Sequence, residues 1–162
     1  MDVLLHCLDI NNLKNRSLNE TFPAISKFPN VTFCHASRRI AVGAKTGVVA
    51  IFELRTPQKS QIITAHAHAL TCCAFSPDGK HLSTYSMDEN KICFWSTSTS
   101  LFGLGQSQIK CVRTYNTKPA SSSGLISLQD PVGQKAPPRL IWVANKALIL
   151  MFSDGSECRY NV

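Results

Sequence analysis

The feature that most constrains the fold is a strand–turn–strand pattern that occurs three times. Residues 40–52 form a short apolar segment, a Lys-Thr-Gly turn and a second apolar segment. Residues 82–95 repeat this shape 42 to 43 positions later (40 to 82, 52 to 95), and residues 140–152 carry a third copy after a further 57 to 58 positions. Self-similarity at a near-constant spacing indicates a repeat architecture, in which each unit buries its apolar face against its neighbours.

Each copy extends to a unit of four expected strands separated by turns. In Ser76-Pro77-Asp78-Gly79, for example, Pro presets φ and Gly accepts a positive φ. The expected strands are residues 31–35, 40–44, 48–54 and 61–65; 70–75, 80–85, 91–95 and 108–115; and 124–129, 139–143, 147–152 and 157–162. Four strands about every 40–45 residues is the period of a β-propeller blade. The predicted fold class is therefore all-β.

The composition is that of an ordinary globular protein. Hydrophobic residues make up 44% of the 162 positions, which argues against a fully disordered chain. The longest clear apolar run is residues 147–152, far short of the ~20 residues of a membrane helix. Asp2 and Asp9 bracket the apolar start of the chain, so we expect neither a secretion signal nor a transmembrane segment.

The seven cysteines predict a reducing, cytoplasmic environment. Their number is odd and no Cys-x-x-Cys pair occurs, so neither a disulfide framework nor a zinc ribbon is indicated. Several lie in apolar, strand-like segments, where a free thiol packs as a small hydrophobic group.

The net charge of +7 raises the question of nucleic-acid binding. Phosphate binding requires clustered basic residues, whereas the longest basic run here is the pair Arg38-Arg39. Between Glu89 and Asp130 the chain has no acidic residue, so one edge is expected to be locally positive and suited to an acidic partner or a membrane surface. We expect no nucleic-acid partner.

The middle unit carries a recognisable motif and resembles a WD40 repeat. Ala65-His66 stands where the family has Gly-His, followed by Phe-Ser-Pro-Asp-Gly at residues 75–79, Thr84 at the Ser/Thr position and Trp95 at the Trp position. The flanking units lack these polar residues and match the family by strand pattern alone.

The WD40 resemblance implies a structural hydrogen-bond relay made of His66, Thr84, Asp88 and Trp95. In the family, an Asp in the turn between the second and third strands accepts from the His, the His meets the Ser/Thr hydroxyl, and the hydroxyl meets the indole N–H. Asp88 is the expected acid, although it lies one residue too far from Ile92; Glu89 has the family register but a longer side chain.

The organisation expected is a partial WD40-type propeller preceded by a short helical segment. Met1, Leu4, Leu5 and Leu8 share one helical face, and a capping box begins at Ser17. Three blades are too few for a closed ring, which typically has 4–8, so we expect remaining blades from a longer chain or from elsewhere. The predicted boundaries are 1–29 for the helical segment, 30–65, 66–115 and 124–162 for the blades, and 116–138 for a Ser/Pro-rich insertion.

Much of the chain resembles the C-terminal propeller of the rabconnectin-3 beta family of WD-repeat proteins. The segments that carry this resemblance are residues 22–28, 40–56, 75–86, 95–101, 110–115, 139–142 and 149–151. It implies a non-catalytic scaffold, peripheral on synaptic or endosomal vesicles, that regulates V-ATPase assembly and vesicle acidification. Rabconnectin-3 alpha and V-ATPase subunits are the implied partners. The alternative is a generic WD-repeat adaptor in another complex.

No catalytic, cofactor or metal site is predicted. His66 and His68 precede Cys72 and Cys73, but adjacent strand residues point to opposite faces and cannot share one ion without a bulge. Residues 43–47 lack the Walker A pattern, and no Gly-x-Ser-x-Gly occurs. We therefore expect no enzyme activity and no cofactor.

Overall fold

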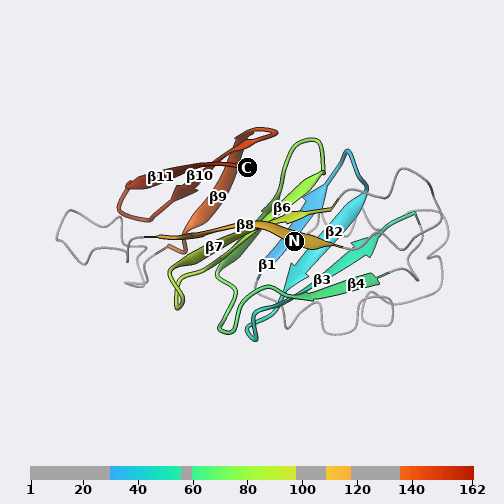
Figure 1. Ribbon diagram of the computed structural model, residues 1–162, viewed down its shortest axis with the longest axis horizontal. Coiled ribbons are helices and arrows are strands. Elements are labelled where there is room, and N and C mark those ends of the chain that lie inside the picture. Colours follow the sequence, from blue (N-terminus) through green and yellow to red (C-terminus); the bar gives the residue numbers. More distant parts are fainter. Residues whose placement is uncertain (1–29, 56–59, 98–108, 118–135) are drawn as a thin grey trace.

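The structure is a computed structural model that describes residues 30–55, 60–97, 109–117 and 136–162. These residues form eleven β-strands in three antiparallel sheets, which follow one another in chain order (Figure 1). The all-β fold class predicted from the repeats is confirmed. The helical segment expected at residues 1–29, the strand expected at 124–129 and most of the insertion lie outside the described residues.

The first sheet contains β1 (Asn30–Cys34), β2 (Arg39–Gly43), β3 (Val48–Glu53) and β4 (Ser60–Thr64), paired in that order. Its central strands are rich in Val, Ile and Phe, which pack well on a pleated surface. Successive side chains point to opposite faces. Apolar residues therefore line both faces of this sheet.

The second sheet contains β5 (Cys72–Phe75), β6 (His81–Ser86), β7 (Lys91–Ser96) and β8 (Lys110–Asn116), again in chain order. This sheet lies between the other two, so β6 and β7 are buried along most of their length, whereas β8 is mostly exposed. The second sheet is therefore the centre of the described structure.

The third sheet has three described strands, β9 (Arg139–Ala144), β10 (Ala147–Met151) and β11 (Glu157–Asn161). Their order is β11-β10-β9, and β5 contacts both β1 and β9. The sequence pattern makes residues 139–143 the second strand of their unit. In the structure, β9 instead has the position that β1 and β5 have in their sheets, so β10 and β11 correspond to second and third strands.

Two apolar clusters join the sheets. The one between the first and second sheets contains Cys34, Ala41, Val49, Ile51, Ala65, Leu70, Phe75, Leu82, Cys93 and Trp95. The one between the second and third sheets contains Tyr85, Ile92, Phe94, Leu148, Leu150 and Phe152. Neighbouring sheets thus bury one another's faces, as repeat units must.

Trp142 on β9 adds a polar link between the second and third sheets. Its indole N–H donates to the Ala74 carbonyl on β5 at 3.1 Å. The same ring stacks on His81 and meets the edge of Phe94. One side chain therefore positions β9 against three strands of the second sheet.

Candidate functional site

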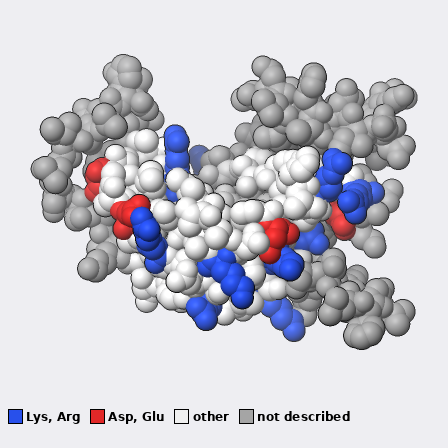
Figure 2. Space-filling model, turned by 90° about the horizontal axis from the view of Figure 1, so that it is seen from above, with Lys and Arg blue, Asp and Glu red and all other residues white. Residues whose placement is uncertain are grey.

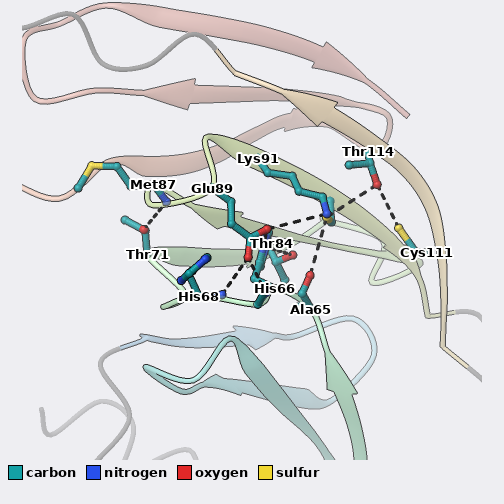
Figure 3. Close-up of polar contacts among 12 residues, drawn as sticks. Ala65, His66, His68, Thr71, Thr84, Met87, Glu89, Lys91, Cys111 and Thr114 are labelled. Atoms are coloured by element: carbon teal, nitrogen blue, oxygen red, sulfur yellow. Dashed lines mark hydrogen bonds and ion pairs between the residues drawn. The ribbon is translucent and has the colours of Figure 1, made fainter.

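Polar side chains of the middle unit form a buried series of hydrogen bonds, the relay expected from the sequence. The Trp95 indole N–H on β7 donates to Thr84 Oγ1 on β6 at 3.0 Å, and Thr84 Oγ1 lies 3.0 Å from His66 Nε2. His66 precedes β5 in the loop that follows β4 (Figure 3). Thr84 is fully buried and His66 is only 3% exposed.

The hydrogen-bonding capacities of these groups determine which atom donates and which accepts at each step of the relay. An indole N–H can only donate, so Thr84 Oγ1 accepts from Trp95 and is free to donate its own proton to His66 Nε2. That nitrogen then carries no hydrogen, and the proton of a neutral His66 is on Nδ1, which lies 3.3 Å from Glu89 Oε2. Burial lowers the pKa of His66, although the bond to Glu89 opposes this, and the imidazole is neutral near pH 7.

Glu89, rather than Asp88, is the acid that meets His66. Both lie in the turn between β6 and β7, but Asp88 is exposed while Glu89 points toward the loop before β5 (Figure 3). Glu89 has the position along the turn that the family motif expects. Its longer side chain also accepts from the backbone N–H groups of Ala67 and His68. This corrects the expectation for Asp88.

The three donors that surround Glu89 also determine its charge. Burial acts to raise the pKa of Glu89, but the hydrogen bonds from the His68 N–H, the His66 ring and the Ala67 N–H outweigh it and hold the pKa below its usual value. Lys91 Nζ lies 3.9 Å from Glu89 Oε2 and adds a weak attraction. Glu89 is therefore an anion that ties two backbone segments together.

Gly47 supports the same loop from the first sheet. Its carbonyl accepts from the backbone N–H groups of Ala65 and His66, at 3.0 and 3.1 Å. Its φ of +78° is in the region that favours glycine. Sequence reasoning places Gly47 in a hairpin turn but does not reveal this contact, because nothing local indicates which loop the turn will meet.

The polar groups of His66, Thr84 and Trp95 are buried and engaged with one another. A catalytic group, by contrast, needs access to a substrate. Cys72 and Cys73 pack against opposite clusters, as strand alternation predicts, and burial raises the pKa of Cys73 to about 12. Among the described residues, no group of three or more His, Cys, Asp or Glu side chains could hold a metal ion.

Charged side chains are spread over the face drawn in Figure 2. Lys and Arg side chains there lie in separate groups, with Asp and Glu between them. The six described cysteines are free thiols. Nowhere in the described residues is there a helix with the length and apolar character that crossing a membrane requires.

Comparison of the fold with solved structures identifies its architecture. The chain is similar to Hsv2 of Kluyveromyces lactis (TM-score 0.57, 12% identity, 76% of this chain and 38% of that one). It is also similar to Sqt1 of Saccharomyces cerevisiae (TM-score 0.58, 13% identity, 84% of this chain and 32% of that one). Both are WD40 propellers. The fold is a partial WD40-type β-propeller.

The WD40 likeness concerns the fold alone at this level of identity. No family model matches the sequence. The chain spans 38% and 32% of the two propellers, which is consistent with three blades of a larger ring. The specific resemblance to the rabconnectin-3 beta family stays a prediction.

Proposed function

We propose that this chain is a non-catalytic protein-interaction scaffold. The observation that carries the proposal is an exposed apolar surface on the third sheet, where Ile141, Val143 and Met151 are 39, 59 and 38% exposed. These side chains lie on the face of β9 and β10 that points away from the second sheet. Contiguous exposed apolar groups on a rigid sheet are typical of protein-binding surfaces.

The more specific proposal is that the scaffold acts in V-ATPase regulation. It rests on the sequence resemblance to the rabconnectin-3 beta family, which implies rabconnectin-3 alpha and pump subunits as partners. The free thiols of the described residues support a cytoplasmic location. On this proposal the remaining blades of the ring come from a longer chain.

Affinity purification from cell lysate tests both levels. The tagged chain is compared with Val143→Asp, which places a charge on the exposed apolar face. Recovery of V-ATPase subunits and rabconnectin-3 alpha with the original chain, and their loss with Val143→Asp, is the expected result. Recovery of other, reproducible partners without pump subunits would favour the generic WD-repeat adaptor. If neither chain retained any specific protein, the scaffold proposal would fail.

Salt-dependent binding separates the scaffold from a nucleic-acid-associated propeller. Binding through phosphates weakens steeply as salt rises. The scattered charges in Figure 2 lead us to expect no specific binding to RNA or DNA at physiological salt. Tight binding with a steep salt slope would contradict this.

A further inference from the structure

His81, the first residue of β6, lies where the second and third sheets meet. Its imidazole ring stacks on the indole of Trp142 on β9, with ring centroids 6.3 Å apart and an angle of 23° between the planes. The Trp142 indole N–H donates to the Ala74 carbonyl of β5. The His81 ring therefore packs against the side chain that positions the third sheet on the second.

The His81 ring can move without displacing its strand. The backbone N–H of His81 donates to Ser76 Oγ, and its carbonyl accepts from the Ser76 N–H, each at 2.9 Å. His81 also pairs with Ser96 on β7. The side chain is half-buried, so a change of χ1 rotamer can separate the ring from Trp142 while β6 stays in place.

The contact with Trp142 suits a neutral imidazole and not an imidazolium. His81 Nδ1 is buried and has no hydrogen-bond partner among the described residues. A neutral ring can carry its proton on Nε2 and leave Nδ1 without one, whereas the imidazolium carries a hydrogen on both nitrogens. Protonation in this position would therefore bury an N–H that has no acceptor, which is costly.

The charged groups around the ring come from both sheets. Burial has the largest effect on the pKa of His81 and lowers it; Asp78 acts to raise the pKa, and Lys146 and Lys80 act to lower it. Lys146 lies in the exposed turn between β9 and β10. The third sheet thus places a positive charge near the ring, which further disfavours an imidazolium in the packed position.

Asp78 offers the protonated ring a partner within the second sheet. Its carboxylate accepts from Ser76 Oγ at 2.6 Å and from the Lys80 N–H at 3.1 Å. Burial acts to raise the pKa of Asp78, but these hydrogen bonds outweigh it and hold the pKa below its usual value. Asp78 is therefore an anion throughout the range in which histidine titrates, in the turn that precedes His81.

We propose that His81 forms a pH-sensitive contact between the second and third sheets, made by the neutral imidazole and released on protonation. The neutral ring packs on Trp142, whereas the imidazolium turns toward Asp78 and leaves β9 more weakly attached. These are two discrete states whose populations a proton can shift. This inference goes beyond the proposed scaffold function and does not depend on it.

The sign of the effect follows from linkage. The pKa of His81 is lower in the packed position than after release, so the released state binds a proton more readily. The contact is therefore complete at neutral pH and is lost as the pH falls through the pKa of the packed ring.

Hydrogen exchange of the full 162-residue chain at about pH 7.5 and about pH 5.5, the range of histidine titration, tests the proposal. Labelling times are adjusted for the pH dependence of intrinsic exchange, and β2 in the first sheet is the internal reference. At the lower pH we expect the amides of β9 and β10 to exchange about tenfold faster relative to β2, a usual size for coupling between two sites. The absence of this difference would overturn the proposal.

Variants of His81 assign the effect to this residue. His81→Phe keeps an aromatic ring on Trp142 without a titrating group, so β9 should stay protected at both pH values. His81→Lys keeps a positive charge at both, so β9 should exchange faster already at the higher pH, and faster than in His81→Met, which has a similar length and no charge. His68→Phe makes the same change at an exposed histidine before β5 and should leave the pH effect as it is. A pH effect on β9 that persists in His81→Phe would overturn the proposal.

Two further variants test the charges that favour release. Without Lys146 the imidazolium is less unfavourable beside Trp142, and without the Asp78 carboxylate it has no anionic partner after release. Lys146→Gln and Asp78→Asn should therefore each reduce the acceleration of β9 at the lower pH. Lys45→Gln, which removes a lysine charge from the exposed turn between β2 and β3, should not. Full acceleration in both Lys146→Gln and Asp78→Asn would show that the proton acts elsewhere.

Discussion

The residues of the relay are matched by hydrogen-bonding capacity. Trp95 contributes a donor, Thr84 accepts and donates, and neutral His66 accepts at Nε2 and donates at Nδ1 to Glu89. A buried polar network is favourable only when each member is satisfied. The relay therefore stabilises the blade only when the charge and the tautomer are both correct, which makes it sensitive to single-atom changes.

Replacing Glu89 with Gln should destabilise the fold, whereas Asp88→Asn in the same turn should have little effect. Gln keeps the length of the side chain but removes the charged acceptor that serves Ala67, His68 and His66. We expect Glu89→Gln to lower the free energy of unfolding by about 1–3 kcal/mol. Asp88→Asn should change it by less than about 0.5 kcal/mol. Urea unfolding measures both, and equal losses would restore Asp88 as the relay acid.

Stability should fall when the pH drops from 7.5 to 5.5. Because burial lowers the pKa of His66 below the unfolded value of about 6.5, the unfolded chain binds a proton more readily. The stabilising contribution of neutral His66 is therefore complete above about pH 6.5 and is lost as the pH falls through the pKa of His66 in the folded state. Glu89, whose pKa is also lowered, adds a further loss at more acidic pH, below about 4.5.

Two histidine variants assign this pH dependence. His66→Phe removes the titrating group and should flatten the change between pH 7.5 and 5.5, although its stability is lower throughout. Burial also lowers the pKa of His81, so His81→Phe should flatten the profile as well, while an aromatic ring still stacks on Trp142. The urea midpoint of each variant is measured at the two pH values. If the difference between the two midpoints is the same in both variants as in the original chain, the assignment is wrong.

The sequence identifies most of the relay but not its acid. His66, Thr84 and Trp95 follow from motif spacing, because the second and third strands of a blade pair in a regular register. The acid depends on how the turn directs two adjacent side chains. That conformation, with Asn90 at a φ of +48°, is determined by the turn as a whole and cannot be derived from Asp88 and Glu89 alone.

At the scale of elements, the turns hold the sheets in position as much as the strands do. The turn at Gly47 contacts the loop that carries His66, and thereby connects the first sheet to the relay of the second. A glycine there has two functions, a positive φ and close approach of another backbone. Gly155, between β10 and β11, has the first function only.

Alanine substitution separates these two functions of glycine. A Cβ at Gly47 would overlap the carbonyl oxygens of His66 and His68, whereas a Cβ at Gly155 meets nothing within 4 Å. Both have a positive φ, +78° and +81°, so Gly155→Ala measures the backbone strain by itself, roughly 1–2 kcal/mol. Gly47→Ala should lower the free energy of unfolding by about 1–3 kcal/mol more. Equal losses in thermal unfolding would show that the loop moves aside.

Strand existence was predictable from alternation, but strand position in the third sheet was not. Residues 139–143 match the second strands of the other units in apolar pattern, whereas among the described strands β9, like β1 and β5, is at the end of its sheet. Only the contact of β9 with β5 shows that β9 comes first. Long-range packing, which a local pattern does not encode, therefore decides the place of each strand.

At the scale of the whole molecule, the three sheets form a linear array in which the second sheet contacts both of the others. Among the described residues, backbone contacts between sheets join β1 and β2 to β5, and β5 to β9. Stability in such an array is approximately the sum of the unit stabilities and the nearest-neighbour interfaces. The third sheet is at one end of the described array and has one covered face, so it should open before the second sheet does.

Leu148→Ala should make the third sheet open locally while the first sheet stays closed. Leu148 is 1% exposed in the cluster between the second and third sheets, so truncation should weaken that interface by about 2–5 kcal/mol. Hydrogen exchange should accelerate in β9, β10 and β11 and remain nearly unchanged in β2 and β3. Val143→Ala, at a position 59% exposed on the opposite face, is the matched control and should change neither. Uniform acceleration across all three sheets would instead show that the array unfolds as one cooperative unit.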